Sequence, residues 1–227
     1  MTAPDILDKG LEAALRLAQT QPWNSLSLRA IAEEAGLPLS DFHGVADRDR
    51  LALHADAYFD SAMSSEGIDP DDHPRERLFD VVMLRFEAME PHREGLLSLY
   101  RSMDRAASLR LQRLKARRQS AEWAFISAGL DTKGPMPLRL KAIGLAWVLA
   151  RTEEAWRRET DPGYAKTMSA LDKGLRQAES QLKRMGAFRF GGSKSRAAGG
   201  TSTSPDDAPE TPASDAAFGS VETPAGA

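Results

Sequence analysis

The side chains that most often carry out catalysis or hold metals are sparse in this sequence. It has no cysteine, and its four histidines, at 43, 54, 73 and 92, are not spaced as metal-binding pairs. None of them stands with a serine and a carboxylate in a recognisable catalytic order, and no glycine-rich phosphate-binding motif is present. We therefore expect no enzyme and no bound cofactor or metal.

One segment instead has the pattern of a nucleic-acid-binding element. Residues 25–38 read SLSLRAIAEEAGLP, in which Ser27 is placed to cap a helix and Gly36 to end it. A short second helix is expected over residues 38–43, opened by Pro38. A helix, a tight turn and a short second helix form a helix-turn-helix motif, whose second helix can enter the major groove of DNA.

The rest of the chain supplies the helices that would position this motif. Apolar residues recur at three- and four-residue spacing up to residue 185 without sustained alternation, which predicts an all-α fold of about nine helices. We expect helices over residues 4–20, 28–35, 38–43, 48–64, 74–89, 92–103, 104–128, 138–159 and 163–185.

The helix-turn-helix segment, the amphipathic helix before it and the later run VADRDRLALHA resemble the N-terminal domain of TetR-family transcriptional regulators. The resemblance covers residues 5–60 at motif level, and residues 60–185 as an all-helical body of suitable length. It implies a TetR-like fold, with a helix-turn-helix head over residues 1–50 and a ligand-binding and dimerisation body over residues 51–185.

The resemblance also implies roles for particular residues. The expected contacts with DNA are Ser27, Arg29, Pro38, Leu39, Ser40, Asp41, His43 and Arg48. Aromatic, methionine and histidine side chains of the body either line an apolar ligand cavity or pack in the core. These are Phe79, Met83, Phe86, Met89, His92, Trp123 and Trp147.

Charge is distributed unevenly along the chain. The net charge is −3 overall, yet residues 1–60 contain five basic and ten acidic residues, which gives −5. DNA-binding domains generally present a basic face to the phosphates. Residues 101–118 hold seven basic residues and one acidic residue, which we interpret as a solvated helix face.

Two functions follow. The first is a TetR-type regulator, a homodimer that binds operator DNA and is released by a small apolar ligand. The alternative is a TetR-fold protein that does not bind DNA but handles lipids or quinones in connection with ubiquinone biosynthesis. A C-terminal amphipathic helix would then contact the membrane through residues 168–190, although the same apolar stripe would also suit a dimerisation helix.

The last segment has a different composition. Of the 42 residues in 186–227, 30 are Ala, Gly, Ser, Thr or Pro, so we expect a disordered tail. No apolar run reaches the ~20 residues that span a bilayer, and the N-terminus lacks a secretory pattern. The expected location is therefore the cytoplasm.

Overall fold

The expected all-α fold is confirmed. The structure is a computed structural model that describes residues 2–132 and 136–194, with side chains described as far as residue 184. Within these ranges the chain forms eight α-helices and four short 3₁₀ helices, and no strand. Residues Met1–Gly186 form one compact unit.

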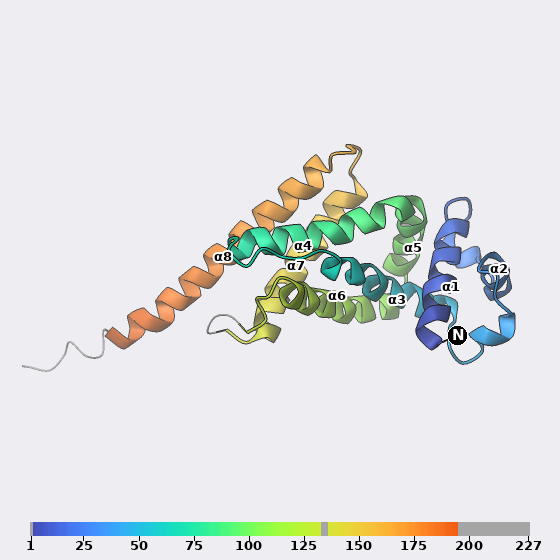
Figure 1. The fold of residues 1–227 in the computed structure, drawn as a ribbon, viewed down its shortest axis with the longest axis horizontal. Helices are drawn as coiled ribbons and strands as arrows, with labels where there is room; N and C mark the ends of the chain where they lie inside the picture. Colours follow the sequence, from blue (N-terminus) through green and yellow to red (C-terminus); the bar gives the residue numbers. More distant parts are fainter. Residues whose placement is uncertain (1, 133–135, 195–227) are drawn as a thin grey trace, which may run out of the picture. The chain divides into compact units, whose positions relative to one another are not determined.

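The N-terminal elements make a small helical head (Figure 1). They are α1 (Ala3–Leu17), a 3₁₀ turn (Trp23–Ser25), α2 (Leu28–Glu34), a 3₁₀ segment (Leu39–Phe42) and α3 (Arg48–Asp60). Helix α1 packs against both α2 and α3. The fully buried side chains Leu11, Leu15, Ile31, Phe42 and Leu51 form the core of the head.

The remaining helices form the body. After a 3₁₀ turn at Ser61–Ser64 come α4 (Pro74–Met89), α5 (Arg93–Arg105), α6 (Ala107–Ser127), α7 (Leu138–Arg157) and α8 (Ala165–Lys194). Pro91 lies in a 3₁₀ turn, Glu90–His92, that separates α4 from α5 as expected. Helix α3 contacts α6, and α6 packs against α7, so α3 links the head to the body.

The C-terminal helix is longer than expected. The sequence predicted disorder from Gly186 onward, but α8 continues to Lys194. A glycine inside a helix costs about 1 kcal/mol relative to alanine, which does not by itself stop a helix whose preceding turns are already formed. The remainder of the predicted tail, residues 195–227, lies outside the described residues.

None of the helices in the described part of the chain is both long enough and apolar enough to cross a membrane.

Two local contacts fix helix positions. At Gly95 on α5, a Cβ atom would lie 2.2 Å from the backbone oxygen of Leu15, so α1 and α5 approach each other backbone to backbone. Before α8, the carboxylate of Glu159 accepts hydrogen bonds from the backbone N–H groups of Lys166 and Thr167, at 2.8 and 3.0 Å. These bonds satisfy donors that the first turn of a helix leaves unpaired.

Candidate nucleic-acid interface and ligand cavities

Individual residues with local effects on the backbone form the start of α2 and the turn between α2 and the 3₁₀ segment. The hydroxyl of Ser27 accepts a hydrogen bond from the backbone N–H of Ala30 at 3.1 Å and so caps α2. Gly36 has a φ of 66°, a left-handed conformation that glycine adopts without the steric cost of a Cβ atom. The helix-turn-helix pattern expected from the sequence is present, with a second helix that is only four residues long and of 3₁₀ type.

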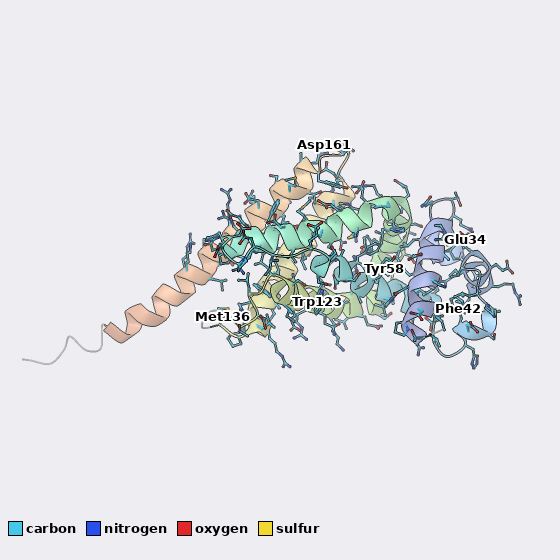
Figure 2. The ribbon with its side chains drawn as sticks, viewed as in Figure 1. Glu34, Phe42, Tyr58, Trp123, Met136 and Asp161 are labelled. Carbon is cyan, nitrogen blue, oxygen red and sulfur yellow. The ribbon has the colours of Figure 1, made fainter. Side chains whose placement is uncertain are left out.

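Phe42 anchors this 3₁₀ segment in the head (Figure 2). Its side chain is fully buried, and a Cβ atom at Gly10 on α1 would lie 2.9 Å from the ring. The absence of a side chain at Gly10 therefore lets the ring sit against α1. With Phe42 directed inward, Leu39, Ser40 and His43 remain exposed.

The residues expected to contact DNA divide into two groups. Asp41 and Arg48 are half-buried. The other six are exposed: Ser27, Arg29, Pro38, Leu39, Ser40 and His43.

Arg48 has a structural role that the sequence did not reveal. Its Nη1 atom donates hydrogen bonds to the backbone carbonyl oxygens of Asn24 and Leu26, at 2.6 and 3.1 Å. Arg48 therefore holds the segment that enters α2. Arg50 likewise donates to the carbonyl oxygens of Gly44 and Val45, whereas Arg29 is an exposed cation on α2 itself.

Some of the acidic residues that give residues 1–60 their negative charge are buried. Asp56 and Asp60 are buried and accept hydrogen bonds from Arg85 of α4, at 2.7 and 2.8 Å. Two of the ten carboxylates are therefore not on the surface of the head. On α2, Glu34 is paired with Arg16 of α1 at 2.7 Å.

A buried network of ion pairs continues from Arg85 into the body. Arg113 on α6 lies 3.7 Å from Asp56 and 2.7 Å from Glu153 of α7. Arg117 and Arg157 also pair with Glu153, at 2.9 and 2.7 Å. The network thus joins α3, α4, α6 and α7, and removing one member would leave a buried charge uncompensated.

Glu153 is the centre of this network. Burial alone would raise the pKa of Glu153, but the guanidinium groups of Arg113, Arg117 and Arg157 outweigh burial and lower the pKa to about 2. Glu153 therefore remains ionised at neutral pH. The basic residues of α6 are accordingly not all on a solvated face, because Arg113 is buried.

The side chains proposed for the ligand cavity do not come together. Phe86 and Met89 are fully buried in the core, and the ring of His92 lies 5.7 Å from that of Phe59. Trp123 and Trp147 are exposed. Phe79 and Met83 do line a cavity, of about 610 Å³, beside residues 66–72 and the start of α8.

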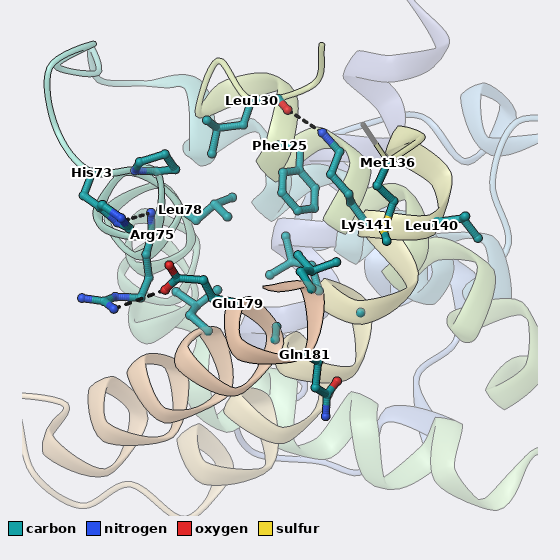
Figure 3. Close-up of a pocket in the computed structure, with 16 residues that line it drawn as sticks. His73, Arg75, Leu78, Phe125, Leu130, Met136, Leu140, Lys141, Glu179 and Gln181 are labelled. Atoms are coloured by element: carbon teal, nitrogen blue, oxygen red, sulfur yellow. Dashed lines mark hydrogen bonds and ion pairs between the residues drawn. The ribbon is translucent and has the colours of Figure 1, made fainter. Parts of the chain in front are cut away.

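A second cavity, of about 520 Å³, lies between α4, α6, α7 and α8 (Figure 3). Its walls are mainly apolar, with a few polar groups. The apolar side chains include Leu78, Phe125, Leu130, Leu140, Leu145, Leu175 and Leu182, and the polar ones are His73, Arg75, Lys141, Glu179 and Gln181.

The sequence analysis missed this cavity because four helices contribute to it. One signal was present, namely the apolar stripe of α8. Leu171 and Leu175 of that stripe are buried in the body, which corrects the expectation that this part of the stripe faces a membrane or a second subunit. Met185, Phe188 and Phe190, which also fall within the expected membrane-contact range 168–190, lie outside the described side chains.

Helices α6 and α7 instead share an exposed apolar face, which we call the α6–α7 face. It consists of Leu111 and Leu114 on α6 and Leu140, Ile143 and Trp147 on α7. Trp147 is 72% exposed and Leu111 is 70% exposed. Several large exposed apolar side chains on two neighbouring helices make this part of the surface a candidate interaction site.

Comparison with known proteins identifies the fold. No protein-family model matches the chain, and no curated protein sequence does. Solved structures do match it, and two of them illustrate the similarity. One is a TetR transcriptional regulator from Nitrosomonas europaea, with a TM-score of 0.62 and 17% identity over 77% of this chain and 98% of that one. The other is a TetR transcriptional regulator from Rhodococcus, with a TM-score of 0.53 and 16% identity over 77% of this chain and 94% of that one.

The chain therefore has a TetR-like fold.

Proposed function

We propose that the protein is a TetR-type transcriptional regulator, located in the cytoplasm, that binds operator DNA through its head. The observation that carries this proposal is the helix-turn-helix geometry, in which Phe42 is buried while Leu39, Ser40 and His43 face outward. Arg29 on α2 adds an exposed cation for a phosphate. The similar solved structures described as TetR transcriptional regulators support the same function.

The regulator acts as a homodimer through the α6–α7 face. A TetR-type head reads one half-site, so two copies are needed to read a two-fold symmetric operator. A standard interface takes ~800 Å² from each partner, and the exposed parts of five large apolar side chains supply much of that area.

A ligand in the cavity between α4 and α8 would release the DNA through α4. One end of α4 contributes Arg75 and Leu78 to the cavity wall. Further along the same helix, Arg85 is bonded to Asp56 and Asp60 of α3, which begins in the head. A ligand that moves α4 therefore moves α3. The ligand can shift the equilibrium between the DNA-bound and released conformations only by the difference in its affinity for them.

Fluorescence anisotropy with DNA from upstream of the protein's own gene tests the proposal. We expect tighter binding to this DNA than to random DNA of the same length. Equal affinity for both at low salt would refute a regulatory role.

The second candidate is a lipid- or quinone-handling protein related to ubiquinone biosynthesis that does not bind DNA. It is favoured by the shortness of the 3₁₀ segment and by the acidic excess of residues 1–60. Its membrane contact would have to come from exposed residues of α8 such as Met168 and Leu182, since Leu171 and Leu175 are buried. Salt-dependent co-sedimentation with anionic liposomes, together with no preference for any DNA, would favour this candidate.

A further inference from the structure

We propose that the cavity between α5 and residues 18–24 binds the phosphate group of a small molecule, held by the guanidinium groups of Arg101 and Arg105. Neither DNA nor a second subunit is needed to complete this site, so it goes beyond the proposed function.

The cavity lies where the connection from α1 to α2 packs against α5. Its volume, about 360 Å³, is within the 300–1,000 Å³ range of small-molecule sites. One wall is formed by residues 18–24 of the connection, and the other by one face of α5. The side chains of that face follow the three- and four-residue spacing of neighbours on a helix. They are Ser98, Arg101, Ser102 and Arg105.

Two cations of this face have no counter-charge. Arg101 and Arg105 are exposed and lie about one helical turn apart, a spacing at which like charges repel. Within the described residues neither guanidinium group has an ion pair or a hydrogen bond, and no carboxylate lines the cavity. Asp104, on the same turn of α5, is paired with Arg157 of α7 at 2.8 Å. Two positive charges therefore remain, which matches the charge of about −2 on a phosphate monoester.

The hydroxyl group of Ser98 also lacks an acceptor. Ser98 is 7% exposed, and its oxygen accepts a hydrogen bond from the backbone N–H of Trp23 at 3.0 Å, which joins the two walls of the cavity. Its hydroxyl hydrogen is donated to no acceptor in the part of the chain that the structure describes. A buried donor without an acceptor is unfavourable. A phosphate oxygen in the cavity would supply that acceptor.

The distribution of donors favours a phosphate over a carboxylate. The exposed amide side chains of Gln19, Gln21 and Asn24 lie in the wall opposite the two arginines. Donors thus surround the cavity from two sides. A phosphate group offers three strong acceptor oxygens that point in different directions, whereas a carboxylate has two in one plane. Arginine also binds phosphate in a bidentate manner.

The arginine-rich cavity between α6 and α7 has fewer free cations. Its charged side chains are Arg110, Arg113, Arg117, Arg157, Asp104, Glu153 and Glu154. Glu153 already pairs with three of these arginines, and Asp104 pairs with one of the three. Arg110 is therefore the single cation of this cavity that has no carboxylate partner among the described residues.

The two other large cavities are also less suited to a phosphate. In the cavity between α4, α6, α7 and α8, the Nζ atom of Lys141 already donates to the carbonyl oxygens of Leu130 and Asp131, at 2.8 and 3.3 Å, and Arg75 is paired with Glu179. The cavity beside Phe79 and Met83 is lined by five carboxylates and one arginine. Its negative excess would repel an anion.

Isothermal titration calorimetry of the full chain with inorganic phosphate tests the site, with chloride used to hold the ionic strength constant. We expect saturable binding that is at least about tenfold tighter than the binding of acetate. The thermal midpoint should also rise with phosphate concentration, because the site exists only in the folded chain.

Four variants locate the site. Arg101→Met and Arg105→Met should each weaken phosphate binding about tenfold, because each removes charge-assisted hydrogen bonds. Both arginines are exposed and unpaired within the described residues, so the thermal midpoint without phosphate should not fall. Arg139→Met removes an exposed arginine of α7, and Arg110→Met removes the unpaired arginine of the cavity between α6 and α7. These two changes should leave phosphate binding unaltered.

Absence of phosphate binding, or equal affinities for phosphate and acetate, would overturn the proposal. Loss of binding in Arg110→Met but not in Arg101→Met would overturn it as well, because the anion would then lie between α6 and α7. If phosphate does not bind but the double variant Arg101→Met/Arg105→Met weakens binding to every DNA duplex, the two arginines contact the DNA backbone instead. Operator affinity is measured without phosphate, so failure of this site leaves the proposed regulatory function standing.

Discussion

Arg85 on α4 and Asp56 on α3 form a buried salt bridge, with 2.7 Å between Nη2 and Oδ1. Arg85 also bonds to Asp60 at 2.8 Å, so one guanidinium group holds two carboxylates one helical turn apart on α3. Because α3 begins at Arg48 in the head, this salt bridge ties the helix-turn-helix end of the compact unit to α4 of the body. Head and body are therefore coupled by a discrete polar contact as well as by apolar packing.

We predict that Arg85→Met lowers the free energy of unfolding by about 3–5 kcal/mol, because it removes the guanidinium group that two buried carboxylates share. Urea unfolding followed by circular dichroism measures the loss. The matched control is Arg176→Met, which removes the exposed pair with Asp172 on α8 and should change stability by less than about 1 kcal/mol. Similar losses in the two variants would show that the buried bridge contributes no more than a surface pair.

Alanine substitutions at two glycines should have opposite effects on stability, because only one of these glycines lies where α1 and α5 approach closely. Gly95→Ala places a methyl group against the backbone oxygen of Leu15, which no side-chain rotation relieves, and should cost about 1–3 kcal/mol. Gly144→Ala meets open space within α7 and should stabilise the protein by up to about 1 kcal/mol. Thermal unfolding of both variants checks this, and a Gly95→Ala protein as stable as Gly144→Ala would contradict the structure.

The ionised carboxylate of Glu159 should contribute to the stability of the fold in a pH-dependent way. Burial alone would raise the pKa of Glu159, but hydrogen bonds from backbone N–H groups, including those of Thr167 and Lys166, outweigh it and lower the pKa to about 2. The carboxylate has a higher pKa in the unfolded chain, so its contribution is present above about pH 4.5 and is lost as the pH falls toward 2.

Glu159→Gln should therefore lower the free energy of unfolding by about 2 kcal/mol at pH 7, since charge-assisted hydrogen bonds are the stronger ones. The difference from the wild type should narrow below about pH 4.5. Urea unfolding at several pH values between 7 and 3.5 measures it, and a difference independent of pH would argue against the ionised cap.

The α6–α7 face predicts the oligomeric state. Trp147→Asp puts a charge in place of the most exposed apolar side chain of this face and should convert a dimer to a monomer in size-exclusion chromatography with light scattering. Trp123→Asp is the matched control, because Trp123 is twelve residues after Leu111 and so lies about a third of a turn around α6 from it. A wild-type monomer, or dissociation by Trp123→Asp but not by Trp147→Asp, would exclude this face as the dimer interface.

Local signals in the sequence were sufficient to predict the head. Ser27, Gly36 and Pro38 each act on the backbone within a few residues, so the helix-turn-helix follows from their order. The function of Arg48 was not visible, because its partners Asn24 and Leu26 lie more than twenty residues away in sequence.

The body was harder to predict, because its packing also depends on contacts between residues that are distant in sequence. Apolar spacing shows that Trp147 and Leu171 belong to helices, but not that Trp147 is exposed while Leu171 is buried. That distinction depends on which helix faces α7 and α8, and a single helical period carries no such information. The cavity and the α6–α7 face therefore emerge only from the packing.

Whether the head reads DNA is decided by fluorescence anisotropy with a labelled duplex from upstream of the protein's gene and a scrambled duplex of equal length. We predict that the wild type binds the upstream duplex about a thousandfold more tightly. Arg29→Ala should weaken binding to both duplexes and reduce the salt dependence, whereas Arg139→Ala, an exposed arginine of the body, should change neither. Equal affinity of the wild type for the two duplexes at about 50 mM salt would contradict the regulatory function.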